Sequence, residues 1–155
     1  MKKSKKSQKL KKKYNNIFVW TYLDEYKNHK KKILKLVDEV FNSGNLILGS
    51  QVQAFEKNFS NYTSNKYGVG VNSGTDALQI ALMANNIKEK DEVITVSNTA
   101  VPTVSAIVSC FAKPVFVDVN ENDYLINCDL IENKITKRTK AIIPVNLYGQ
   151  SADYT

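Results

Sequence analysis

The residues best suited to do chemistry are NSGTD, residues 72–76, which lie between an apolar segment and a helical pattern. The N-terminus of a helix offers free backbone N–H groups and a partial positive charge. Ser73 and Thr75 add hydroxyl donors, and Gly74 lets an anion approach the backbone. The stretch therefore predicts a phosphate site, and helix capping by Ser73 or Thr75 is the alternative interpretation.

The glycine spacing G-x-G-x-x-x-G at Gly68, Gly70 and Gly74 superficially suggests a dinucleotide-binding fold. Two features disfavour it. Residues 67–71 keep a strand pattern through the first two glycines, so these glycines are expected inside a strand. The acidic residue expected at the end of the next strand is replaced by Asn98. A P-loop is excluded because no Gly-Lys-Ser/Thr sequence occurs.

Strand and helix patterns alternate from residue 66 onward. We expect strands at 67–71, 92–96, 114–119 and 141–145, and helices at 75–85, at 102–110 and, as a short piece, near 129–134. The later strands are apolar runs, which a parallel sheet covered on both faces requires. The predicted fold class is therefore α/β, with a mostly parallel sheet, flanking helices and a ligand site at the carboxyl ends of the strands.

Two helices are expected before the sheet. Residues 26–41 carry apolar side chains at helical spacing with lysines opposite. A second helix begins at Ser50, which has capping-box spacing with Gln53. Its buried face is expected to contain Val52, Phe55 and Phe59.

The net charge of +7 belongs to the start of the chain. Eight lysines fall within residues 2–13, and the rest of the protein has 14 basic and 15 acidic residues. We expect a disordered Lys-rich tail at 1–13, a helical segment at 14–65 and a partial α/β domain at 66–155. A specific nucleic-acid role is disfavoured because no aromatic residue interleaves these lysines.

Several other classes of protein find little support. No apolar run approaches the about 20 residues of a membrane span, and no secretory signal follows the lysines. Cys110 and Cys128 are expected to be buried or half-buried in a reducing cytoplasm. His29 is the single histidine, which disfavours a metal site. We therefore predict a cytoplasmic protein without a membrane segment.

Residues 48–154 resemble the DegT/DnrJ/EryC1/StrS sugar aminotransferases, which use pyridoxal 5'-phosphate (PLP). The resemblance is carried by five blocks in the family's order and spacing. These blocks are LGSQVQAFEKNF, VNSGTDALQIAL, KDEVITVSNTAVPTVSAI, KPVFVDVNENDYLIN and ITKRTKAIIPVNLYGQSAD. The lysine tail at 1–13 lies outside the part of the chain that carries the resemblance.

The resemblance implies the N-terminal part of the large domain of a type I PLP aminotransferase, in a homodimer. It implies that Ser73, Gly74 and Thr75 contact the phosphate of PLP. Ala100 occupies the position where many members stack an aromatic ring on the pyridine, and Asn146 stands where many have His. The segment around Ala100 resembles the branch that aminates 3-keto-6-deoxy sugars on a nucleotide carrier, with an amino donor such as glutamate.

No catalytic residue is assigned within this chain. In the family, the Schiff-base lysine and the aspartate that pairs with the pyridinium lie beyond the Leu-Tyr-Gly block at 147–149, and the sequence stops at Thr155. We expect an incomplete fold that is inactive alone, poorly soluble or dependent on a partner carrying the remainder. A non-catalytic module that keeps the phosphate site is the alternative, and a dinucleotide oxidoreductase is disfavoured.

Overall fold

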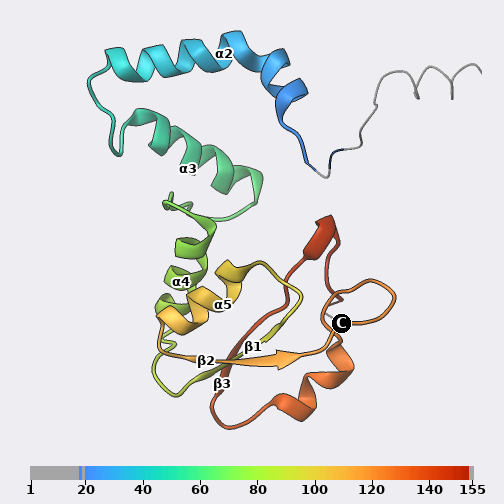
Figure 1. The fold of residues 1–155 in the computed structure, drawn as a ribbon. Coiled ribbons are helices and arrows are strands. Elements are labelled where there is room, and N and C mark those ends of the chain that lie inside the picture. Colours follow the sequence, from blue (N-terminus) through green and yellow to red (C-terminus); the bar gives the residue numbers. More distant parts are fainter. Residues whose placement is uncertain (1–17, 19, 154–155) are drawn as a thin grey trace, which may run out of the picture. The chain divides into compact units, whose positions relative to one another are not determined.

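The chain divides into two compact units, residues 1–68 and 69–155. The computed structural model describes residues 18 and 20–153 (Figure 1). The predicted tail at 1–13 lies outside the described residues. Each unit is described by itself below.

The first unit contains two helices, α2 (Leu23–Asn42) and α3 (Ser50–Tyr62). Both predicted helices are confirmed, and α2 starts three residues earlier than expected. The predicted capping box is wrong, because Ser50 is already helical and the N-cap is Gly49, which has no side chain to accept a hydrogen bond. Gly49 is required there, since a Cβ would lie 2.9 Å from the Asn45 carbonyl oxygen.

The predicted buried face of α3 is not buried in this chain. Val52 is half-buried, but Phe55 and Phe59 are exposed, with their stacked rings 5.7 Å apart. Ser60 is the buried residue of the helix. The helical spacing of the apolar side chains is correct, but spacing alone does not show whether a neighbour covers them.

The second unit contains a parallel sheet with the strand order β2-β1-β3. Its strands are β1 (Glu92–Val96), β2 (Lys113–Val117) and β3 (Thr139–Ile143). The three later predicted strands are thereby confirmed, with ends shifted by up to two residues. All five residues of β1 are buried, because this strand has a neighbour on each side and a covered face above and below.

The strand predicted at 67–71 is wrong, because these residues form no strand. Both sides of β1 are already occupied, so this segment could pair only with β2 or β3. Gly68 instead lies close to the backbone of α3, where an added Cβ would be 2.6 Å from the Glu56 carbonyl oxygen. Its lack of a side chain therefore permits a close approach to a helix and does not serve a strand.

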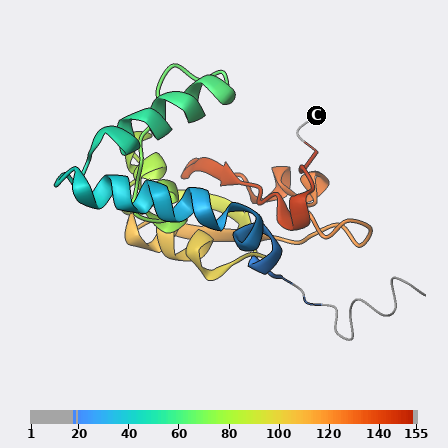
Figure 2. The same cartoon turned by 90° about the horizontal axis from the view of Figure 1, so that it is seen from above.

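Helices cover one face of the sheet. The helices α4 (Gly74–Ala84) and α5 (Val101–Ser109) pack on each other (Figures 1 and 2). They share one apolar cluster with the sheet, formed by Leu82, Ile87, Val93, Ala106, Ile107, Cys110 and Ala112. This arrangement confirms the expected helices at 75–85 and 102–110.

A second apolar cluster covers the other face, formed by Ile94, Val96, Val117, Ile126 and Ala152. The short helix expected near 129–134 is present as two 3-10 turns, η1 (Cys128–Leu130) and η2 (Glu132–Lys134). Ile131, between these turns, packs against this cluster. The predicted α/β class with a parallel sheet and flanking helices is confirmed, and in this chain both faces are covered only at the central strand β1.

A buried carboxylate joins the starts of the three strands. Glu92 is 2% exposed and accepts hydrogen bonds from the Thr136 hydroxyl at 2.6 Å and the Arg138 guanidinium at 2.7 Å. The Lys113 ammonium lies 3.8 Å away. The Thr136 hydrogen bond, aided by Arg138 and Lys113, lowers the pKa of Glu92 against the effect of its burial. Lys113 therefore lies at the amino ends of the strands, opposite the edge where ligands bind in such sheets.

Candidate functional site

The N-terminus of α4 has the donor groups that a phosphate needs. Ser73 is the N-cap in extended conformation, and its Oγ accepts a hydrogen bond from the Asp76 N–H at 3.1 Å. The Ala77 N–H bonds to the Ser73 carbonyl at 3.0 Å. Within residues 20–153, the N–H groups of Gly74 and Thr75 have no acceptor. The capping interpretation is therefore confirmed for Ser73, and two amides remain available for a ligand.

Gly74 leaves these amides open to solvent. A Cβ added at Gly74 would meet no atom within 4 Å, so the fold itself does not demand a glycine here. The Thr75 hydroxyl also has no hydrogen-bond partner among the described residues, and the Ser73 hydroxyl keeps its own proton for donation. Two amides and two hydroxyls at the positive end of a helix fit a phosphate group.

Ala100 lies at the start of a different helix. It is the N-cap of α5, is exposed, and contributes no side-chain cap. Beside it, the hydroxyl oxygens of Thr99 and Thr103 are 2.8 Å apart and share a hydrogen bond. Ser73, Gly74 and Thr75 lie together at the start of α4, and Ala100 lies at the start of α5, which packs on α4. No hydrogen bond joins the two helix starts in the described part of the chain.

Tyr124 is a residue that the sequence did not single out. Asn98 follows the end of β1 and precedes Ala100 by two residues. Its side-chain amide donates to the Tyr124 carbonyl at 3.3 Å and holds this tyrosine beside the end of the strand. Tyr124 is 57% exposed, and its backbone is left-handed, with φ of 62°. Asn98 and Tyr124 are 26 residues apart, so no local pattern could have predicted the contact.

The turn after β3 uses Asn146 as a structural residue. Its side-chain oxygen accepts a hydrogen bond from the N–H of buried Ala152 at 2.9 Å. Val145, Tyr148 and Gly149 all have positive φ, so the chain turns sharply here. The side-chain oxygen is therefore engaged in holding the turn.

The two cysteines differ in exposure. Cys110 is buried, and burial raises the pKa of its thiol. Cys128 is exposed, which contradicts the expectation that both would be buried or half-buried. Its thiol donates to the Asp153 carbonyl at 3.0 Å. Local sequence could not reveal this difference, because burial of a 3-10 turn depends on which elements cover it.

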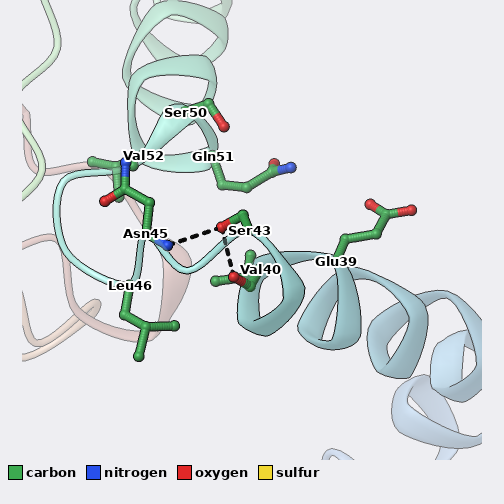
Figure 3. A pocket seen from close by; sticks show the side chains of 9 residues that line it. Glu39, Val40, Ser43, Asn45, Leu46, Ser50, Gln51 and Val52 are labelled. Carbon is green, nitrogen blue, oxygen red and sulfur yellow. Dashed lines mark hydrogen bonds between the residues drawn. The ribbon is translucent and has the colours of Figure 1, made fainter.

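Other candidate features carry no site. Within the described residues, no group of three or more His, Cys, Asp or Glu could hold a metal ion. The described helices include none with the length and apolar character to cross a bilayer. A hollow of about 80 Å³ in the α2–α3 turn is too small for a cofactor (Figure 3). It lies beside Ser43, whose hydroxyl donates to the Val40 carbonyl and accepts from the Asn45 N–H.

Comparison with known proteins gives related sequences over most of the chain. The chain is 51% identical over 138 residues to a dTDP-3-amino-3,4,6-trideoxy-alpha-D-glucose transaminase of Micromonospora megalomicea, covering 89% of this chain and 37% of that protein. It is 38% identical over 121 residues to the 3-oxo-glucose-6-phosphate:glutamate aminotransferase of Bacillus subtilis, covering 78% of this chain and 27% of that protein.

Solved structures match the fold as well. The Streptomyces venezuelae protein DesV, in complex with a ketimine intermediate, matches with a TM-score of 0.83 and 37% identity, over 86% of this chain and 36% of that one. The Bacillus subtilis protein NtdA, with bound cofactor PMP, matches with a TM-score of 0.79 and 36% identity, over 81% of this chain and 29% of that one.

The chain spans between 27% and 37% of the length of these four relatives. The model of the DegT/DnrJ/EryC1/StrS aminotransferase family matches residues 27–155, which include the α4 N-terminus and all three strands. The chain therefore belongs to the DegT/DnrJ/EryC1/StrS aminotransferase family.

Proposed function

We propose that this chain is the N-terminal part of a PLP-dependent aminotransferase that acts on a nucleotide-activated keto sugar. The observation that carries the proposal is the pair of unpartnered amides at Gly74 and Thr75, at the start of a helix in a chain of this family. Bound PLP supplies an electron sink for amino-group transfer, and the protein supplies its binding and orientation.

Each residue of the site has a defined contribution in this proposal. The amides of Gly74 and Thr75 bind the phosphate, and the hydroxyls of Ser73 and Thr75 donate to its remaining oxygens. The partial positive charge of α4 favours the dianion over a neutral ligand. Ala100 contacts the ring side of the cofactor, where its methyl group leaves an aromatic face uncovered. Tyr124, which is exposed, is the candidate to cover that face.

The chain is inactive alone in this proposal, because the lysine and the aspartate of the family's chemistry lie outside its matching blocks. The amino donor is glutamate, as in the name of the Bacillus subtilis relative, and the sugar is carried on a nucleotide, as in the name of the Micromonospora relative. The complete enzyme is a homodimer. Two free cysteines are in keeping with a reducing cytoplasm.

The proposal is tested with pyridoxamine 5'-phosphate (PMP), because its amine cannot form a Schiff base with the many surface lysines. Equilibrium dialysis should show saturable binding of PMP by the 155-residue chain and much weaker binding of pyridoxamine, which lacks the phosphate. Equal affinity for the two compounds would exclude the phosphate site. Transaminase activity of the purified chain would exclude the proposed inactivity.

A further inference from the structure

The positive charge of the protein is concentrated in its first 35 residues. They include 13 lysines and two acidic residues, whereas the rest of the chain has 9 basic and 13 acidic residues. Eight of these lysines lie in the tail at 2–13, outside the described residues, and the other five lie exposed on α2. Of those five, Lys30, Lys31 and Lys32 form no ion pair in the described part of the chain. The family model begins at residue 27, so most of these lysines precede the segment shared with the family.

Exposed aromatic side chains lie between the two groups of lysines. Phe18 is 68% exposed and Trp20 is 76% exposed, and the rings of Trp20 and Tyr22 lie 5.5 Å apart. In the sequence, Ile17 and Val19 alternate with Phe18 and Trp20. Tryptophan and tyrosine favour the boundary between lipid and water, because their rings have an apolar body and a polar group. An apolar group of this kind among many lysines is typical of a segment that lies on a membrane surface.

We propose that residues 2–35, the basic segment, bind the surface of a membrane that contains anionic phospholipids. The lysines pair with the lipid head groups, and Phe18 and Trp20 insert at the interface. Stable attachment to a membrane surface takes two signals, and the basic segment supplies an electrostatic and an apolar one. Such attachment needs no spanning helix, and the described residues include none. It does not depend on PLP, so its test is separate from that of the phosphate site.

A nucleic acid is the other polyanion that lysines attract, but the residue types favour lipid. Arginine, whose planar guanidinium binds a phosphate through two hydrogen bonds, is absent from the basic segment. Lysine carries a compact charge that needs no fixed geometry, which suits a fluid layer of head groups. Proteins that bind single strands place aromatic rings along a basic groove, where bases stack on them. Here the rings form one group with Ile17 and Val19.

Trp20 is the single tryptophan of the chain, so its fluorescence reports on the basic segment alone. The 155-residue chain is titrated with vesicles of phosphatidylcholine and with vesicles that also contain phosphatidylserine. The emission of Trp20 should shift to shorter wavelength with the anionic vesicles only, because its exposed ring then leaves water. Added salt should weaken this binding, since it screens the attraction between lysines and head groups.

A pair of double variants separates the basic segment from net charge. Lys12→Gln with Lys13→Gln should weaken vesicle binding at least about tenfold, because each lysine near an anionic surface contributes to the attraction. Lys137→Gln with Lys140→Gln removes the same charge from exposed positions of the second unit. This control should weaken binding less than about twofold, since screening confines the attraction to lysines close to the head groups.

A second pair of variants tests the apolar signal while Trp20 remains as the probe. Phe18→Ser should weaken binding about fivefold or more, because the inserted ring no longer leaves water. The control Phe111→Ser removes a ring that is 79% exposed in the second unit. It should weaken binding less than about twofold, since Phe111 lies outside the basic segment.

The proposal is wrong if the emission of Trp20 does not shift with anionic vesicles. It is also wrong if the shift is the same with neutral vesicles, because the exposed apolar surface would then bind lipid without regard to charge. Equal losses from the variants of the second unit would contradict a defined segment. A double-stranded oligonucleotide that binds more tightly than the anionic vesicles, at equal phosphate concentration, would assign the lysines to nucleic acid.

Discussion

The substitution Gly74→Asp separates phosphate binding from folding. Gly74 is the first residue of α4, it is exposed, and a side chain there meets no atom within 4 Å. A carboxylate at this end of a helix interacts favourably with the helix dipole, by about 0.3–1 kcal/mol. The variant should therefore fold at least as stably as the natural chain.

The same carboxylate repels a phosphate on the adjacent amides. At a separation of about 6 Å, two unit charges repel each other by about 0.7 kcal/mol in water, and a phosphate dianion doubles this value. Because the site is exposed, the water value is the appropriate lower limit. A loss of about 1.4 kcal/mol weakens binding about tenfold. Blocked access to the Gly74 and Thr75 amides adds to this loss.

The assay is equilibrium dialysis of PMP against the natural chain, Gly74→Asp and the control Ser50→Asp. Ser50 is the first residue of α3, as Gly74 is of α4, and it is exposed. Both variants therefore add one negative charge at the same point of a helix. We expect at least a tenfold rise in the dissociation constant for Gly74→Asp and less than a twofold rise for Ser50→Asp.

Two results would refute this reasoning. If Gly74→Asp binds PMP as tightly as the natural chain, the phosphate does not lie at the α4 N-terminus. If both variants weaken binding equally, the effect is one of net charge and not of a site. Thermal unfolding of all three proteins checks that a loss of binding does not arise from a loss of structure.

Three further predictions concern other parts of the structure. The lowered pKa of Glu92 stabilises the fold above the unfolded pKa of about 4.3, and this contribution is lost as the pH falls through the lower folded value. Glu92→Gln should thus lower the melting temperature at pH 7, and the difference from the natural chain should shrink toward pH 3; a difference independent of pH would contradict the assignment. In the native chain, a thiol reagent should modify Cys128 rapidly and Cys110 only after unfolding, and equal rates at both would contradict their placement. Asn146→Ala removes the hydrogen bond to the Ala152 N–H and should cost about 1 kcal/mol or more in urea unfolding, and an unchanged midpoint would show that the bond does not hold the turn.

The candidate phosphate site was predictable from sequence because its parts are local. Ser73, Gly74 and Thr75 are consecutive, and a polar stretch before a helical pattern is enough to place backbone amides at a helix start. The strands β1, β2 and β3 were also predictable, since runs of apolar residues are typical of strands in a parallel sheet.

Features that depend on neighbours were not predictable. Residues 67–71 have a strand pattern, yet both sides of β1 are taken and no strand forms. The apolar stripe of α3 has helical spacing, but its phenylalanines remain exposed in this chain. Ser50 has capping-box spacing, yet the helix begins one residue too early for the box.

The sequence by itself thus determined the family, the order of most elements and the candidate stretch that we propose binds a phosphate, because these depend on residue type and short spacing. The tertiary structure alone decided which residues meet across the chain. Asn98 reaches Tyr124, Thr136 and Arg138 reach Glu92, and Asn146 reaches Ala152. The first two contacts join segments 26 to 46 residues apart and the third closes a turn, and each exists only where the folded backbone brings a donor and an acceptor together.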